Sequence, residues 1–226
     1  MLLYYITDRK GLAGSEAQQR DGLLHRIAEA ARAEVDYIQL REKDLSTRDL
    51  ERLARDAVRA VRENSSATKL LINGRADVAL ACGADGVHLP AGEISGTEIR
   101  ALWKKCSDCE PLVGVSAHST AEMREAESLG ASFAVLAPIF EKMGTEAKGI
   151  GIDTLRLACA GPQVATRVEA PHQHGIAVLA LGGVNLANAR SCVEAGAAGV
   201  AGIRLFQSGD IFETVRGLRE MADTLP

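Results

Sequence analysis

Short apolar runs alternate with amphipathic stretches along the whole chain. The runs consist mainly of branched aliphatic residues without polar alternation, as in Leu2–Ile6 near the start and in 177–184 and 199–206 near the end. Such runs are typical of strands buried on both faces of a parallel sheet. The predicted strands are 2–6, 35–40, 69–72, 87–89, 112–116, 133–137, 177–184 and 199–206.

Helical patterns fill the intervals between these runs. Apolar residues recur at helical spacing in 23–33 and 47–62, which predicts amphipathic helices. Further helices are expected over 76–82, 97–105, 121–129, from Asp153, over 186–195, and from Asp210 to near Leu225. The expected helix caps are Ser119, with Glu122 completing a capping box, and also Asn185 and Asp210.

Eight strand–helix units in strict alternation predict an α/β fold, a single (β/α)8 TIM barrel that spans residues 1–226 as one domain. An open doubly wound sheet is the alternative. The glycine doublet lies near the end of the chain and not after the first strand, which disfavours a dinucleotide-binding fold.

Composition narrows the function classes. The 226 residues carry 30 acidic and 26 basic side chains, so a nucleic-acid partner is not expected. No apolar run reaches the length of a membrane span, and the first residues read as a strand and not as a signal peptide. Five cysteines, an odd number, fit reduced thiols and a cytoplasmic location. Cys106 and Cys109 have C-x-x-C spacing, which we interpret as a surface turn in preference to a zinc or redox site.

Glycines end the last two predicted strands. Gly182 and Gly183 have no Cβ, so a ligand can lie directly on their backbone N–H groups. Glycine turns after the last two strands form the common phosphate-binding site of (β/α)8 barrels. The sequence therefore predicts a phosphate site at these turns.

Cations gather where the predicted strands end. In a (β/α)8 barrel the active site lies at the C-terminal ends of the strands. The residues there include six cations in a protein that is anionic overall, namely Arg9, Arg41, Lys43, Arg75, Lys142 and Arg204. We expect about half of them to form ion pairs with Asp8, Glu42 and Glu93, and the remainder to attract a phosphorylated metabolite.

The histidines permit two interpretations each. His88 lies inside an apolar strand and is either a core imidazole or a site residue, and His118 either faces the pocket or braces the Ser119 cap. His172 and His174 indicate a solvated turn more than a metal site. The glycine-flanked loop 141–149 is long enough for a mobile lid or for a merely flexible loop.

Several stretches together resemble the thiamin phosphate synthase/TenI family over nearly the whole chain. They are Tyr5-Ile-Thr-Asp-Arg9, Ile38-Gln-Leu-Arg-Glu-Lys-Asp44, Leu71-Ile-Asn73, Ala84-Asp-Gly-Val-His-Leu89, Gly114-Val-Ser-Ala-His-Ser119, Ala180-Leu-Gly-Gly-Val184 and Ala195-Gly-Ala-Ala-Gly-Val200. The resemblance implies a thiamin-pathway enzyme. In a synthase, a pyrimidine diphosphate ionises and a thiazole phosphate nitrogen captures the resulting carbocation, while Mg²⁺ and cations hold the diphosphate.

The resemblance also implies roles for individual residues. Gln39, Arg41, Lys43 and Asn73 would hold the pyrimidine diphosphate, and Gly183 with the backbone of Ile203 and Arg204 would hold the thiazole phosphate. Arg75, His88 and Ser116 complete the expected substrate-binding set.

Two departures from the synthase pattern concern metal and diphosphate. Synthases have Asn-Asp after strand three, where this chain has Asn73-Gly74, and their second magnesium carboxylate falls at Glu93. Their Pro-Thr-x-Thr-Lys segment aligns with Glu141-Lys-Met-Gly-Thr145. One carboxylate is a weak holder of Mg²⁺. The departures favour the TenI branch of the family, the thiazole tautomerases, which need no metal. Three stretches of this chain resemble that branch: Asn73-Gly-Arg75, Leu89-Pro-Ala-Gly92 and Ser116-Ala-His-Ser119.

The catalytic base of a tautomerase is not in its usual place. The family's histidine aligns with Pro138, so His118 or Glu141 would have to serve, with Lys142 beside them. The sequence thus favours tautomerase chemistry without a cofactor, with Mg²⁺-dependent synthase chemistry as the alternative. A non-catalytic phosphate-ligand binding protein is the third possibility. Expected partners are a phosphorylated thiazole, a pyrimidine diphosphate for a synthase, and further copies of the chain in a homo-oligomer.

Overall fold

Eight parallel strands close into a barrel in the computed structural model, which describes residues 1–92, 94–141, 148–160 and 175–225. Each strand pairs with the next in the chain, and β8 pairs with β1. The strands are β1 Leu2–Ile6, β2 Tyr37–Leu40, β3 Lys69–Asn73, β4 Gly86–Leu89, β5 Leu112–Ala117, β6 Phe133–Leu136, β7 Ala177–Ala180 and β8 Gly199–Gly202. The (β/α)8 prediction is confirmed, and the open sheet is excluded.

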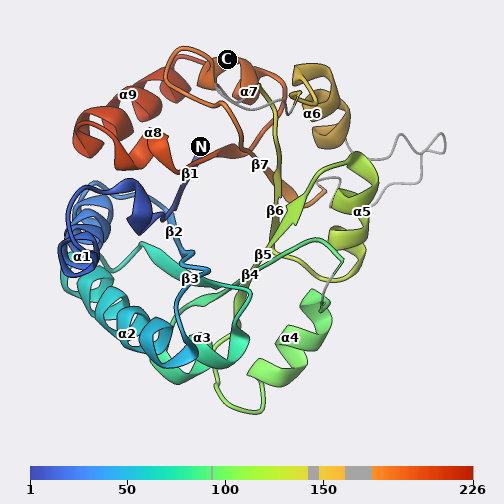
Figure 1. Cartoon of the computed structure of the whole chain (residues 1–226). Helices are drawn as coiled ribbons and strands as arrows, with labels where there is room; N and C mark the ends of the chain where they lie inside the picture. Colours follow the sequence, from blue (N-terminus) through green and yellow to red (C-terminus); the bar gives the residue numbers. More distant parts are fainter. Residues whose placement is uncertain (93, 142–147, 161–174, 226) are drawn as a thin grey trace.

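Helices surround the barrel, and Figure 1 shows them as an outer ring around the strands. They are α1 Glu16–Arg32, α2 Thr47–Asn64, α3 Ala76–Cys82, α4 Gly96–Trp103, α5 Thr120–Ser128, α6 Ile152–Cys159, α7 Ala189–Glu194, α8 Arg204–Gln207 and α9 Ile211–Asp223, with a 3-10 turn, η1, at Arg9–Gly11. None of the helices in the described ranges is long and apolar enough to cross a membrane.

Two apolar layers hold the barrel together. On β1, Tyr4 and Ile6 point into the barrel and pack with residues such as Phe133 and Leu179. Leu3, on the same strand, packs between the sheet and the helices. Because successive strand residues point to opposite faces, one short strand supplies both layers. This explains the apolar runs without polar alternation.

The last two strands end earlier than predicted. β7 stops at Ala180 because Gly182 and Gly183 adopt φ values of +94° and +68°, which an extended strand does not allow. β8 stops at Gly202, and the segment predicted to continue it forms the short helix α8. Both differences have the same consequence: the glycines lie in turns at the barrel mouth.

Helix starts also differ from the predictions. α1 begins at Glu16, earlier than predicted, because Ser15 and Gln18 form a capping box there. The first turns of this helix carry no apolar stripe, so the apolar pattern did not indicate them. The predicted caps at Ser119 and Asp210 are confirmed. The predicted Glu122 capping box is wrong, because that carboxylate accepts a hydrogen bond from the backbone N–H of His118 instead.

The start of α7 differs for a separate reason. Asn185 does not cap this helix, which begins after Asn188. The Asn185 side chain accepts hydrogen bonds from the backbone N–H groups of Ala187 and Asn188, forming a turn that precedes the helix.

Candidate active site

One cavity of about 1070 Å³ opens at the C-terminal ends of the strands. It gathers most of the residues singled out from the sequence. The predicted residues that line it are Gln39, Arg41, Lys43, Asn73, His88, Ser116, His118, Glu141, Gly182, Gly183, Ile203 and Arg204. The fold therefore brings together residues from seven strand ends or the loops that follow them.

Among the described residues, one predicted site residue, Arg75, is not part of the cavity lining. Arg75 turns away from it, since its guanidinium pairs with Asp77 at 2.6 Å and donates to Thr47 at 3.0 Å. Its placement does not fit the expected substrate contact. Glu93 and Lys142 lie outside the described residues, as do His172, His174 and most of the loop predicted to be a lid.

The glycine turn after β7 presents free backbone donors. Among the described residues, neither the N–H of Gly182 nor that of Gly183 donates a hydrogen bond. Two hydrogen bonds to its carbonyl groups fix the turn. The Asn188 side chain donates to the carbonyl of Gly183 at 3.0 Å, and the Phe140 N–H donates to the carbonyl of Gly182 at 2.9 Å. A rigid turn with unpaired N–H groups is suited to an anion. Asn188 also lines the cavity and was not foreseen.

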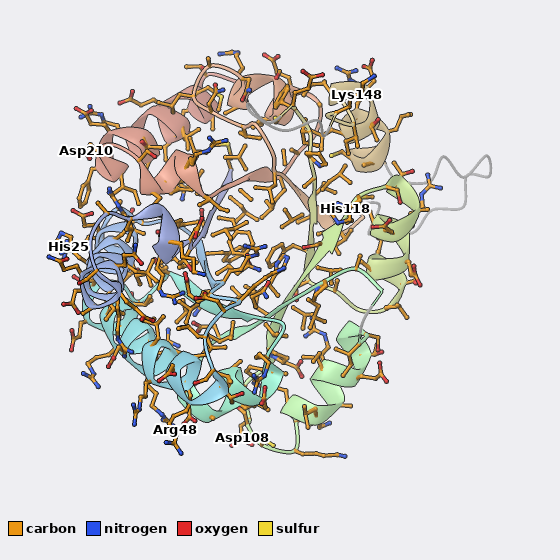
Figure 2. The ribbon with its side chains drawn as sticks, viewed as in Figure 1. His25, Arg48, Asp108, His118, Lys148 and Asp210 are labelled. Atoms are coloured by element: carbon orange, nitrogen blue, oxygen red, sulfur yellow. The ribbon has the colours of Figure 1, made fainter. Side chains whose placement is uncertain are left out.

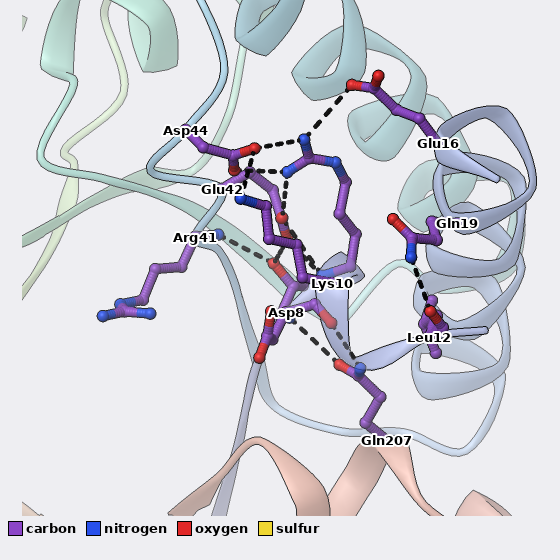
Figure 3. Close-up of polar contacts among 11 residues, drawn as sticks. Asp8, Lys10, Leu12, Glu16, Gln19, Arg41, Glu42, Asp44 and Gln207 are labelled. Atoms are coloured by element: carbon purple, nitrogen blue, oxygen red, sulfur yellow. Dashed lines mark hydrogen bonds and ion pairs between the residues drawn. The ribbon is translucent and has the colours of Figure 1, made fainter. Parts of the chain in front are cut away.

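Gln207, the last residue of α8, binds the end of β1. Its side-chain N–H donates to the carbonyl of Asp8 at 2.6 Å, and its side-chain oxygen accepts from the N–H of Asp8 and the hydroxyl of Tyr5. Figure 3 shows this contact between α8 and the end of β1. The backbone of Ile203 and Arg204 is thereby tied to the first strand of the barrel.

Cations line the cavity after β2. Arg41 is half-buried and Lys43 is exposed, and within the described part of the chain no carboxylate lies within ion-pair distance of either. The two residues between and after them, Glu42 and Asp44, bind Arg9 instead. This alternation leaves the charge of Arg41 and Lys43 available to a ligand.

Arg9 is buried and forms an ion-pair network with Glu42 and Asp44, which are labelled in Figure 3, so it is not a free cation of the rim. Its guanidinium donates to both oxygens of Asp44 at 2.7 Å and to Glu42 at 3.0 Å. Glu42 also accepts from the Thr7 hydroxyl, which in turn accepts from the backbone N–H of Arg41. The hydrogen bonds from Arg9 hold the pKa of Asp44 well below its usual range. The network therefore fixes the backbone that carries Arg41.

His118 directly follows β5, and its position is labelled in Figure 2. Its Nδ1 lies 2.9 Å from the carbonyl oxygen of Ala137. A carbonyl only accepts, so we assign a proton to Nδ1, and in the neutral form of the ring Nε2 then has an unshared electron pair. His118 is exposed and lines the cavity, as does Glu141, so both remain candidates for a base.

His88 is both a core residue and a lining residue of the cavity. It is 3% exposed, and its nitrogens lie 3.1 Å from the Tyr4 hydroxyl and 2.9 Å from the Ser116 hydroxyl. Burial, and next the positive charge of Arg41, lower the pKa of His88 to about 3. The imidazole is therefore neutral at physiological pH.

We expect this buried histidine to make stability depend on pH. An unfolded histidine binds a proton below about pH 6.5, whereas folded His88 does not until about pH 3, so stability falls as pH decreases through this interval. The contribution between pH 6 and pH 5 is about 1 kcal/mol. Urea unfolding at several pH values gives the dependence of the unfolding free energy on pH. His88→Asn should lose this contribution to the pH dependence, whereas His25→Asn, on the exposed surface of α1, should keep the native pH dependence. Equal pH dependence in native protein and His88→Asn would contradict the assignment.

The described residues alone do not form a magnesium site. They contain no group of three or more His, Cys, Asp or Glu side chains placed to hold a metal. At the end of β3, Asn73 accepts a hydrogen bond from the Gln39 side chain at 3.4 Å, and the next residue, Gly74 at φ +63°, offers no side-chain ligand. Mg²⁺ prefers several oxygen ligands in octahedral geometry, which these two residues do not supply.

The fold and the cavity define a (β/α)8 barrel with its polar site at the C-terminal ends of the strands. The family model described as "Thiamine monophosphate synthase" matches residues 3–206. The chain belongs to this family, and its members act in thiamin biosynthesis.

Relatives and solved structures agree with this assignment. The thiamine-phosphate synthase of Syntrophomonas wolfei is 32% identical over 222 residues, covering 97% of this chain and 95% of the relative. That of Roseiflexus sp. is 34% identical over 205 residues, covering 88% and 75%. The structure of thiamine phosphate pyrophosphorylase from Pyrococcus furiosus matches with a TM-score of 0.75 at 27% identity, covering 98% and 95%.

Proposed function

We propose that this protein joins a pyrimidine diphosphate to a thiazole phosphate, forming thiamin phosphate and releasing diphosphate. The observation that carries the proposal is that one cavity is lined by two groups suited to anions. Among the described residues, the N–H groups of the glycine turn after β7 have no hydrogen-bond partner, and Arg41 and Lys43 after β2 have no carboxylate partner. A reaction between two phosphorylated substrates requires two such groups.

In this proposal, different residues bind the two substrates. The turn at Gly182 and Gly183 binds the thiazole phosphate and fixes the position of the ring nitrogen. Arg41 and Lys43 hold the diphosphate, and their charge stabilises the negative charge that develops as the bond between carbon and diphosphate oxygen breaks. The thiazole nitrogen then forms the new bond to that carbon. Holding both substrates in one cavity makes the bond-forming step effectively unimolecular.

The names of the relatives support this order of candidates. The synthase names of the relatives given above do not support the tautomerase preference drawn from the sequence. The proposal assigns no step to Mg²⁺, because the described residues alone do not form a site for this ion.

Thiazole tautomerisation is the second candidate, and two observations favour it. Gly74 replaces the carboxylate expected in a synthase, and His118 presents Nε2 without a proton beside the cavity. A base at that position is able to move a proton on a thiazole ring bound at the glycine turn. A protein that only binds the phosphate ligand is the third candidate.

Two assays separate these candidates. Purified protein is incubated with both synthase substrates and Mg²⁺, and thiamin phosphate is quantified; steady turnover supports the proposal. Conversion of the thiazole tautomer to its aromatic form, lost in His118→Ala or Glu141→Gln, would instead support tautomerase chemistry. Binding of thiazole phosphate without either product would leave only the non-catalytic role, and it would overturn the proposal.

Replacing Arg41 by glutamine should weaken the coupling reaction. The variant removes a charge that faces the diphosphate, so we expect kcat/KM to fall by about 10-fold to 100-fold. Steady-state kinetics measure the loss. Arg48→Gln is the matched control, because it makes the same change of charge at an exposed position on α2 (Figure 2). An equal loss in both variants would indicate a general effect of charge and would contradict the assigned role.

A further inference from the structure

A chain of hydrogen bonds connects the closed core of the barrel with the cavity. Tyr4 on β1 is fully buried, and its hydroxyl lies 3.1 Å from His88 Nδ1 on β4. The other ring nitrogen, Nε2, lies 2.9 Å from the hydroxyl oxygen of Ser116 on β5. Ser116 lines the cavity. The three side chains therefore lead from the barrel interior to the cavity.

The imidazole occupies a slot that the surrounding residues define. A Cβ at Gly114 would lie 2.7 Å from His88 Nδ1 and 2.5 Å from the ring of Phe133, so glycine is what leaves room for the histidine. The rings of Tyr4 and Phe133 pack edge to face with centroids 5.3 Å apart. Close packing on these sides restricts the orientation of the imidazole ring.

The burial of Tyr4 decides which nitrogen of His88 carries the proton. The imidazole is neutral, so only one nitrogen is a donor. Within the described ranges, His88 Nδ1 is the hydrogen-bond partner of the Tyr4 hydroxyl, and aromatic rings surround the phenol. If Nδ1 carried the proton, the phenol proton would be buried without an acceptor, which costs about 1–3 kcal/mol. The favoured tautomer therefore has an unprotonated Nδ1 and a protonated Nε2.

This tautomer sets the direction of the serine hydroxyl. Nε2–H donates to Ser116 Oγ, so the hydroxyl proton of Ser116 is free to point into the cavity. Arg41 lies close enough for its charge to act on His88, and it lines the same cavity. Ser116 and Arg41 thus offer donors to the same region.

We propose that Tyr4 and His88 are positioning residues that fix the Ser116 hydroxyl as a hydrogen-bond donor to an anionic oxygen of the substrate held by Arg41. The inference rests on the proposed function for the identity of that substrate. The tautomer and the hydrogen-bond chain do not depend on it.

The tautomer is tested on the native protein without substrate. Long-range ¹H–¹⁵N correlation spectra of protein labelled with ¹⁵N-histidine distinguish protonated from unprotonated ring nitrogens, and the His88→Asn spectrum assigns the signals. We expect Nε2 protonated and Nδ1 unprotonated across neutral pH, with Nδ1 shifting in Tyr4→Phe. A proton on Nδ1, or an imidazolium near pH 6, would overturn the proposal.

Kinetics test whether Tyr4 acts through Ser116. Removing one hydrogen bond in Tyr4→Phe should lower kcat/KM of the coupling reaction by about 3-fold to 10-fold, and Ser116→Ala should lower it at least as much. The double variant should be no slower than Ser116→Ala, because the pathway is already broken. Losses that multiply in the double variant would show that Tyr4 acts independently, which would overturn the positioning role.

Tyr37→Phe is the matched control for these variants. Tyr37 belongs to the same aromatic cluster, with its ring centroid 5.2 Å from that of Phe133, and in the described structure its hydroxyl has no hydrogen-bond partner. The control should keep native kinetics and the native His88 signals. If the native protein forms no thiamin phosphate, the proposed function fails, whereas the spectra still decide the hydrogen-bond chain.

Discussion

Replacing Arg9 by glutamine is expected to lower the free energy of unfolding by about 3–5 kcal/mol, the usual cost of breaking a buried ion pair. The side chains of Arg9 and Glu42 are 5% and 2% exposed, so the variant leaves a carboxylate buried without its cation. Urea unfolding monitored by circular dichroism measures the loss.

Two further variants identify the cause. Arg20→Gln breaks an ion pair with Asp56 in which both side chains are about one-third exposed, and we expect a loss of about 0–1 kcal/mol. Adding Glu42→Gln to the Arg9 variant should recover part of the stability, because the buried charge is removed. A small loss in Arg9→Gln, or no recovery in the double variant, would show that the network is not a stabilising one.

The same network should give the native protein a distinct acid response. The pKa of Asp44 is lowered in the folded state, so its contribution is present above its unfolded pKa, near 4, and is lost as pH falls below it. Arg9→Gln removes the largest cause of this shift, the hydrogen bonds from Arg9, and leaves the smaller contribution of Lys10 in place. Between about pH 5 and about pH 3, the free energy of unfolding of the variant should therefore fall less than that of the native protein.

Replacing Gly183 by alanine is expected to weaken binding of thiazole phosphate by at least about 100-fold, which corresponds to losing most of one oxyanion site. The residue has φ +68°, and an added Cβ would lie 2.7 Å from Phe140 Cβ and 2.9 Å from the carbonyl oxygen of Glu141. The turn would have to move, and its N–H groups would no longer converge on the phosphate. Isothermal titration calorimetry measures the affinity.

Gly209 supplies a control for backbone strain. It has φ +69°, nearly the value at Gly183, but a Cβ added there would meet no described atom within 4 Å. Gly209→Ala should cost about 1–2 kcal/mol of stability through left-handed strain and leave binding unchanged. Native affinity in Gly183→Ala would mean that the phosphate binds elsewhere.

Part of the site could be foreseen because strand ends are visible in the sequence. Gln39, Arg41, Asn73 and Ser116 follow or end apolar runs, and the C-terminal ends of parallel strands meet at one mouth. The glycine doublet was informative for the same reason, since it follows a buried run directly. The bounds of β7 and β8 were wrong, because apolar character continues past the residues whose backbone turns away.

The fate of each rim cation could not be foreseen in this way. Arg9 and Arg41 both follow strands and carry the same charge, yet Arg9 is buried in a network and Arg41 faces the cavity. Ion pairs depend on which side chains the closed barrel brings within about 4 Å, and charge alone does not specify them. Asn188 was missed because its role is to brace the carbonyl of Gly183, a contact that no spacing rule predicts.

The sequence by itself determined the barrel, its eight strands and the position of its mouth, because buried strands and amphipathic helices have periodicities that are local properties of the chain. The tertiary structure alone decided which groups at the mouth are free and which are held. Glu42 lies 33 residues from Arg9, and His88 lies 84 residues from Tyr4. Such pairs form only when the barrel closes, so their hydrogen bonds are properties of the folded molecule.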